Sequence, residues 1–173
     1  MIIPMRQQEG DGLLELINYL PTGIVMAEVG CYAGESTRLF IESGKIKKMY
    51  AIDPWENGYD DTDPASKSDM KLVEKLFDYN VKGYDVVKLK MIISEAIEDL
   101  PLLDAIYIDG NHQYDAVLCD ITLTINIVKK NGIISGHDYR KENSIVRVVN
   151  EIFGKPDMIF SDTSWLNKNN INI

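Results

Sequence analysis

The chain has 173 residues, of which 45% are hydrophobic and 26% are charged, and its formal net charge is -9. This length suits one domain with a sizeable core, so residues 1–173 are expected to form a single domain. The acidic balance argues against nucleic acid as a partner, because phosphate binding needs a basic face. No apolar run approaches the ~20 residues of a membrane span and no signal peptide is recognised, so a cytoplasmic location is expected.

The first half of the chain alternates helical patterns with short apolar runs. An N-terminal helix is predicted within residues 1–22, and we interpret it as a candidate lid or oligomer contact. A long polar loop, residues 54–66, is interpreted as an active-site loop. Strands are expected at residues 24–29, 49–52 and 84–89, with helices at residues 36–43 and 70–77.

The second half continues the alternation and ends in two short strands. Helices are expected at residues 94–100, 117–128 and 145–153, the second of them closed by Asn131-Gly132. Strands are expected at residues 104–108, 133–135, 158–160 and 165–171. This pattern predicts an α/β, Rossmann-like fold: a mostly parallel seven-stranded sheet with helices on both faces and a β-hairpin at the C-terminus. Ligands of such sheets bind at the carboxyl ends of the strands.

A glycine-rich turn follows the first predicted strand. Gly30 and Gly34 bracket the turn, and Ser36 lies near the first turn of the next helix, where free N–H groups face a ligand. Asp53 ends the second strand, in position to bind a pair of ribose hydroxyls. Dinucleotide binders use GxGxxG, which is absent here. The Glu28 carboxylate suits a cationic ligand better than a diphosphate, which favours S-adenosylmethionine over NAD.

These segments carry a family resemblance. Residues 28–36, together with Asp53, resemble the first two motifs of class I S-adenosylmethionine-dependent methyltransferases. Residues 104–114 and 132–139 are similar to the small-molecule O-methyltransferase branch that includes macrolide-sugar and cephalosporin-tailoring enzymes. The resemblance implies an S-adenosyl-L-methionine cofactor, a methyltransferase fold, and O-methylation of a hydroxyl on a small molecule or sugar.

The resemblance also implies a set of cofactor-binding residues. Trp55 either covers the adenine or plugs the long loop as a hydrophobic residue. Ser94 either contacts the adenine or caps the helix that it starts. The cofactor-binding residues implied in this way are Glu28, Gly30, Tyr32, Gly34, Ser36, Asp53, Trp55, Ser94 and Asp109.

A polar cluster is expected where the fourth and fifth strands end. In the metal-dependent relatives that the chain resembles, the places of Asp109 and Asp138 bind a divalent cation, here Mg²⁺ or another metal. His137 stands where those relatives often have a further acidic residue; it is a third candidate ligand, for a softer divalent metal, or it donates to the substrate, or it does neither. Alternatively, Asp109 forms a turn and Asp138 caps a helix. Strand geometry, if it persists, makes the His137 and Asp138 side chains diverge.

His112 matches the place of the catalytic base in some relatives, and a pKa near 6.5 suits that role. Asp109 is its expected catalytic partner. Two other functions stay open: an NAD-type oxidoreductase, disfavoured by the missing GxG, and a non-catalytic cofactor-binding protein. The expected partner is a small-molecule or sugar acceptor. A homo-oligomer is a further candidate, because little sequence is left over for a substrate lid.

Overall fold

The computed structural model describes residues 11–140 and 143–170. The predicted helix within residues 1–22 is therefore described only from residue 11 onward, and residue 171, at the end of the last predicted strand, lies outside the described residues. Within the described ranges, no helix combines the length and the apolar character that crossing a membrane requires.

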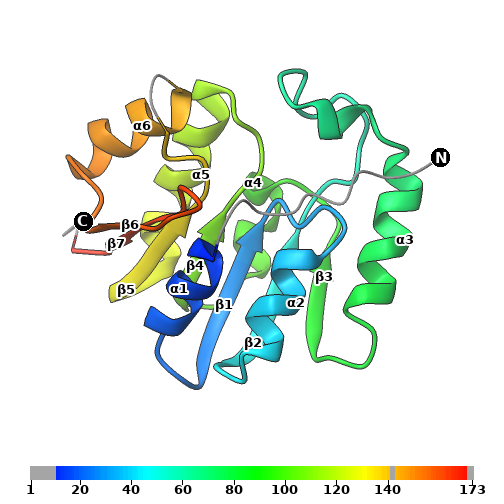
Figure 1. The fold of residues 1–173 in the computed structure, drawn as a ribbon, viewed down its shortest axis with the longest axis horizontal. Helices are drawn as coiled ribbons and strands as arrows, with labels where there is room; N and C mark the ends of the chain where they lie inside the picture. Colours follow the sequence, from blue (N-terminus) through cyan, green and yellow to red (C-terminus); the bar gives the residue numbers. More distant parts are fainter. Residues whose placement is uncertain (1–10, 141–142, 171–173) are drawn as a thin grey trace.

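The sheet places the strands so that the first and fourth are neighbours. Its order is β3-β2-β1-β4-β5-β7-β6 (Figure 1). The first five strands run parallel, and the last two form the predicted antiparallel hairpin beside β5. The strand order reverses between β1 and β4, the position where open sheets of this kind bind ligands. The strands are β1 (Ile24–Val29), β2 (Ile46–Ile52), β3 (Val86–Leu89), β4 (Leu103–Ile108), β5 (Val128–Gly136), β6 (Met158–Ile159) and β7 (Trp165–Lys168).

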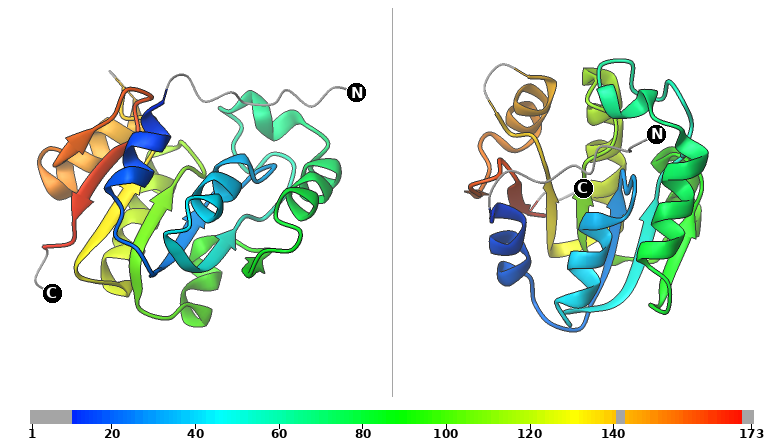
Figure 2. Two further views of the ribbon diagram at one scale, coloured as in Figure 1. Left: turned by 60° about the horizontal axis from the view of Figure 1, so that its bottom comes forward. Right: turned by 45° about the vertical axis from the view of Figure 1, so that its right-hand side comes forward.

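Helices cover both faces of the sheet (Figure 2), and α1, α2 and α3 pack on the face opposite α4, α5 and α6. The predicted fold class is therefore confirmed. The helices are α1 (Gly12–Tyr19), α2 (Glu35–Glu42), α3 (Met70–Asn80), α4 (Ile93–Ala96), α5 (Tyr114–Ile127) and α6 (Ser144–Phe153), with short 3₁₀ helices η1 (Pro64–Lys67) and η2 (Ile97–Asp99).

The central strand β4 contributes to the cores on both faces. Ile106 and Ile108 pack in the core beneath α5 and α6, whereas Tyr107 packs against Phe40 on the other face, with ring centroids 5.2 Å apart. Successive side chains of a strand point to opposite faces, so a strand covered on both sides reads as a continuous apolar run. This double coverage fixes where β4 ends, and with it the position of the polar residues that follow.

Helix α1 joins the core through one face. Leu13, Leu16 and Leu20 are buried in the same cluster as Phe160 and Leu166. The helix thus packs beside the C-terminal hairpin rather than over the carboxyl ends of the parallel strands.

The predicted junction between the long helix and the fifth strand was wrong. The helix predicted at residues 117–128 ends at Ile127, and β5 begins directly at Val128 instead of after Asn131-Gly132. Asn131 takes a left-handed φ of 63° within this strand, and its N–H donates to the carbonyl of Asn169 at 3.0 Å. Tertiary pairing with the C-terminal segment therefore replaces the helix end that Asn-Gly usually signals.

Candidate functional site

The loop from β1 to α2 needs glycine at two positions. Gly30 has φ 85°, and a Cβ there would lie 2.1 Å from the carbonyl oxygen of Asp109. Gly34 has φ 84° and precedes α2, and a Cβ there would lie 3.0 Å from the ring of Phe77. The β1 and β4 ends can approach this closely only because Gly30 has no side chain. The glycine spacing noted in the sequence thus has a steric cause.

Asp53 ties this loop to the loop that follows β2. Its Oδ2 accepts the backbone N–H of Tyr32 at 2.9 Å, and its Oδ1 accepts that of Trp55 at 2.7 Å. Burial raises the pKa of Asp53, although these hydrogen bonds oppose the shift. The carboxylate keeps further lone pairs for a ligand, as a carboxylate has about four acceptor positions.

Glu28 lies behind the loop rather than on its surface. The side chain is fully buried and accepts hydrogen bonds from the hydroxyls of Ser36 and Thr37. Burial raises the pKa of Glu28 to about 7, despite these two bonds. Ser36 lines the cavity described next and Glu28 does not, so the Glu28 carboxylate reaches the cavity only through Ser36.

A cavity opens at the carboxyl ends of β1, β2 and β4. Five of the predicted cofactor-binding residues line it: Gly30, Tyr32, Ser36, Asp53 and Asp109. The loop of residues 54–66 forms another wall, in keeping with its interpretation as an active-site loop. Its lining residues are Pro54, Glu56, Tyr59, Asp60, Asp63, Ala65 and Ser66.

Trp55 is packed as a plug behind this cavity. It is 3% exposed, its indole N–H donates to the carbonyl of Tyr32 at 2.8 Å, and its ring centroid lies 4.8 Å from that of Phe77. It does not line the cavity, so its position matches the second of the two sequence interpretations. Ser94 is exposed on α4 and does not line the cavity either; the residue before α4 is Ile92, so the helix-cap alternative for Ser94 was wrong.

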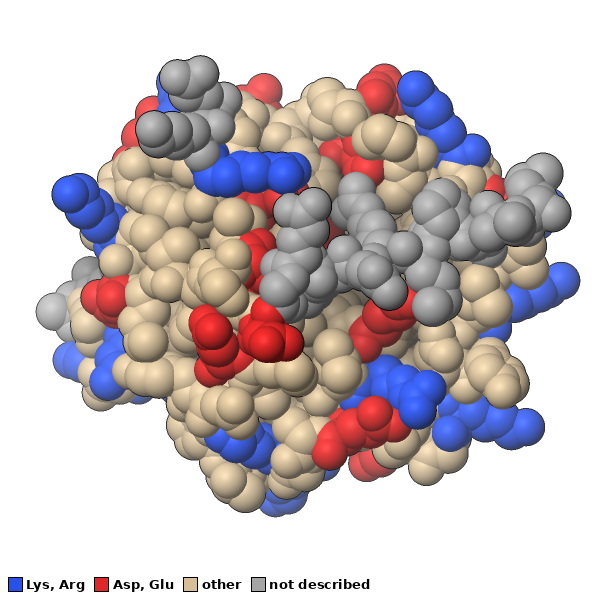
Figure 3. Space-filling view, viewed as in Figure 1, with Lys and Arg blue, Asp and Glu red and all other residues tan. Residues whose placement is uncertain are grey.

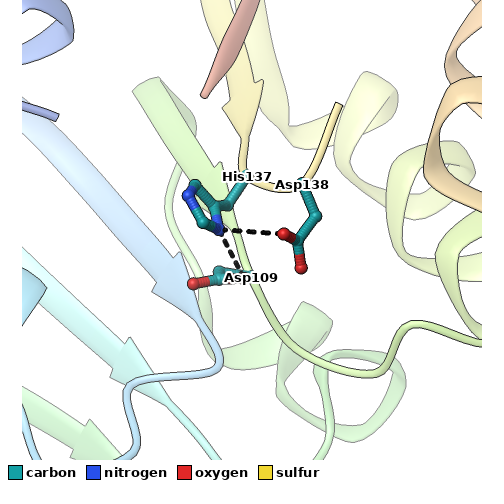
Figure 4. A group of neighbouring side chains, drawn as sticks. All are labelled: Asp109, His137 and Asp138. Carbon is teal, nitrogen blue, oxygen red and sulfur yellow. Dashed lines mark ion pairs between the residues drawn. The ribbon is translucent and has the colours of Figure 1, made fainter. Parts of the chain in front are cut away.

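Three predicted metal ligands meet beside the cavity. Asp109 follows β4, and His137 and Asp138 follow β5, its parallel neighbour. One ligand atom from each lies within 4.8 Å of the others (Figure 4). His137 Nδ1 is 3.7 Å from Asp109 Oδ1 and 3.5 Å from Asp138 Oδ1. The predicted convergence of the two carboxylates is confirmed.

The condition under which His137 and Asp138 were expected to diverge, continued strand geometry, is not met. Strand β5 ends at Gly136, and Asp138 has a left-handed φ of 60°, so strand alternation does not extend to this pair. Asp138 does not cap α6 either, because Asn143 does so, accepting from the N–H of Val146 at 3.0 Å. Two carboxylates and one imidazole nitrogen are donors that suit a divalent cation, and their spacing fits one.

His112 lies among three carboxylates. Its Nε2 is 2.9 Å from Asp138 Oδ2 and 3.9 Å from Asp109 Oδ1, while its Nδ1 is 2.7 Å from Asp60 Oδ2. Burial alone would lower the pKa of His112, but the bond to Asp138, the charge of Asp109 and the bond to Asp60 raise it to about 9. In this arrangement the ring is protonated at neutral pH and cannot accept a proton. The predicted role of His112 as a base therefore requires the neutral ring, with Nε2 released from Asp138.

A second, open cavity lies on the other side of His112. His112 and Asp138 both line it, next to the loop residues Thr62 and Asp63. Most of the other lining side chains are polar. They are Pro64, Gln113, Tyr114, Arg140, Asn143, Ser144 and Ile145.

Sequence reasoning missed two residues of this region. Asp60 was one of several acidic residues in the polar loop, and nothing local distinguishes it from Asp61, which is exposed. Asp120 is a buried carboxylate on α5, close to Gly110 of the cavity wall, and its Oδ2 has no hydrogen-bond partner among the described residues. Its place in a helical pattern beside Ile121 indicated only a surface position, so no sequence signal identified it.

Comparison with known proteins agrees with this architecture. Residues 27–139, more than half of the chain, match the family described as "Methyltransferase domain", and the chain belongs to that family. An uncharacterized protein of Acanthamoeba polyphaga mimivirus is 28% identical over 138 residues. That match covers 75% of this chain and 59% of the viral protein, so the chain spans less than two thirds of that relative's length.

Two solved structures share the fold at low sequence identity. Cofactor-bound Rv0187 from MTB has a TM-score of 0.66 and 13% identity, with 99% of this chain and 84% of that chain covered. The O-methyltransferase TomG from Streptomyces achromogenes, involved in tomaymycin synthesis and solved with SAM, has a TM-score of 0.62 and 10% identity, with 89% and 76% covered. At these identities the likeness establishes the fold of this chain.

Proposed function

We propose that this chain is an S-adenosyl-L-methionine-dependent methyltransferase that methylates a hydroxyl oxygen of a small polar molecule, such as a sugar. One observation carries the proposal: Asp109 both lines the cavity of the glycine loop and belongs to the cluster with His137 and Asp138. A cofactor seated against Gly30 and an acceptor oxygen at the cluster would therefore meet at Asp109.

The charges around the site suit a cationic cofactor. Glu35, Asp53, Glu56, Asp60 and Asp63 all line the first cavity. Figure 3 shows Asp and Glu side chains near the middle of the face viewed, with Lys and Arg side chains mostly toward its edges. A sulfonium and an ammonium group gain from such surroundings, whereas the diphosphate of NAD would be repelled.

The second cavity is the proposed acceptor site. Its polar lining suits a hydroxyl-rich molecule, since hydroxyl groups can both donate to and accept from such side chains. His112 and Asp138 line this cavity, so an acceptor bound there would lie beside the cluster. In the reaction, the oxygen–methyl bond forms as the sulfur–methyl bond breaks, the sulfonium becomes a thioether, and the hydroxyl proton passes to a base. Correct alignment of oxygen, methyl carbon and sulfur supplies much of the rate.

We assign the hydroxyl proton to the neutral form of His112, whose Nε2 points at the cluster. Asp109, His137 and Asp138 would hold a divalent cation, which supplies Lewis acidity that lowers the pKa of a bound hydroxyl.

Transfer from methyl-labelled S-adenosyl-L-methionine tests this proposal. The protein is incubated with a panel of monosaccharides and phenols, with Mg²⁺, with Mn²⁺ or with chelator, and the products are read by NMR. The expected result is a labelled O-methyl signal that Asp138→Asn abolishes and the matched loop variant Asp61→Asn retains. A labelled methyl group on nitrogen or carbon, or O-methylation that survives both chelation and Asp138→Asn, would contradict it.

A further inference from the structure

Both carboxylate oxygens of Asp60 are engaged in hydrogen bonds, although the residue belongs to a surface loop. The residue is 4% exposed. Its Oδ1 accepts from the backbone N–H of Thr62 at 2.8 Å and from the Thr62 hydroxyl at 2.6 Å. Its Oδ2 accepts from the backbone N–H of His112 at 2.8 Å and lies 2.7 Å from Nδ1 of the same residue. The carboxylate is thus fixed in its own loop and directed at one histidine.

The bond to Asp60 fixes which nitrogen of the His112 imidazole faces the cluster. A carboxylate only accepts, so Nδ1 carries the hydrogen that Asp60 receives. Nε2 is then the nitrogen that faces Asp138 and Asp109. In histidines that act at reaction centres, the partner of one ring nitrogen sets the tautomer and the direction of the other.

The same contact holds the loop of residues 54–66 against the end of β4. A second bond supports it, from the side-chain amide of Asn111 to the carbonyl of Tyr59 at 2.6 Å. Tyr59 and Asp60 line the first cavity, whereas His112 lines the second. The Asp60–His112 contact therefore lies at the boundary between the proposed cofactor and acceptor cavities.

We propose that Asp60 is the positioning residue of the site: it orients His112 toward the cluster, and does so only while loop 54–66 lies against the first cavity. This inference rests on the proposed function, because it gives the orientation a use in methyl transfer. Binding of the cofactor against the loop would then stabilise the His112 orientation, and the reverse holds by linkage. The acceptor would then meet the oriented base more often in the cofactor-loaded protein than in the free protein.

Proton–nitrogen correlation spectra of the imidazoles test the orientation. The chain has two histidines, so His137→Gln assigns the His112 signals. Wild-type protein is expected to show an Nδ1–H proton on His112 protected from exchange. Asp60→Ala should lose this protection, Asp60→Asn should keep the fold but shift the signal, and the matched neighbour Asp61→Ala should change nothing. A protected, unshifted Nδ1–H in Asp60→Asn, or equal effects of the Asp60 and Asp61 variants, would overturn the inference.

Titration with S-adenosylhomocysteine separates this inference from the proposed function. Binding to His112→Gln, which loses the contact with Asp60 at a residue that does not line the first cavity, should be about fivefold weaker than to wild type, the low end of coupling between linked sites, with Asp61→Ala unchanged. Failure of the wild type to bind the ligand would overturn the proposed function and, with it, the coupling to the cofactor. The orienting role of Asp60 would then still be decided by the His112 spectra. Binding by wild type that His112→Gln leaves unaltered would overturn the coupling alone.

Discussion

Replacing Gly30 by alanine should destabilise the protein more than the same change at Gly23, and the structure sets the difference. Both glycines have nearly the same left-handed φ, 85° at Gly30 and 81° at Gly23. An L-residue in this region costs about 1–2 kcal/mol, and this cost is common to both variants. A Cβ at Gly23 would meet no atom of the described residues within 4 Å, whereas at Gly30 it would lie 2.1 Å from the carbonyl oxygen of Asp109.

The Cβ added at position 30 would meet backbone atoms of Asp109 and Gly110, so no side-chain rotation relieves the contact. Overpacking of this kind typically adds about 1–3 kcal/mol, which is the expected difference between the two variants. The alanine effect on the unfolded chain is shared by both and cancels. Because the clash displaces Asp109, Gly30→Ala should also weaken Mn²⁺ binding at the cluster, and Gly23→Ala should not.

Urea unfolding followed by tryptophan fluorescence measures the difference, since Trp55 and Trp165 are both buried. Calorimetric titration with Mn²⁺ provides the second readout. If the two variants lose the same free energy of unfolding and keep the same Mn²⁺ affinity, the close approach of the β1 and β4 ends is not what requires glycine at position 30.

Three further predictions follow from single side chains. Burial raises the pKa of Asp120 from 3.8 to about 7. The contribution of Asp120 to the free energy of unfolding is therefore complete below about pH 4 and is lost as pH rises through 7, by at most about 4 kcal/mol. Asp120→Asn should flatten this pH dependence in urea titrations, and an unchanged slope would count against the prediction. Asp138→Asn should weaken Mn²⁺ binding by at least about tenfold in calorimetry, and equal affinity would remove Asp138 from the ligand set. Trp55→Ala should cost about 3–5 kcal/mol of unfolding free energy; retained stability with lost S-adenosylhomocysteine affinity would instead place Trp55 over the adenine.

The sequence predicted those parts of the site that follow directly from strand ends. Gly30, Asp53 and Asp109 each follow a buried apolar run, and parallel strands bring such positions to one edge of the sheet. The convergence of Asp109 with Asp138 could be predicted for the same reason, because the two strands are parallel neighbours.

Other features depend on tertiary contacts that no local pattern encodes. Asp60 meets His112 across 52 positions of sequence, and its neighbour Asp61 has the same side chain without that contact. Asn131 reads as a helix end but pairs with Asn169 near the C-terminus. The left-handed backbone of Asp138 turns its side chain toward His137, which strand alternation alone would not predict.

Calorimetric titration of the full chain with S-adenosylhomocysteine, and in parallel with NAD, tests the central claim most directly. The glycine loop without a GxG, the acidic cavity lining and the Asp109 that joins cavity to cluster all predict binding of S-adenosylhomocysteine at one site per chain and no binding of NAD. Binding of NAD with no heat from S-adenosylhomocysteine would contradict the account.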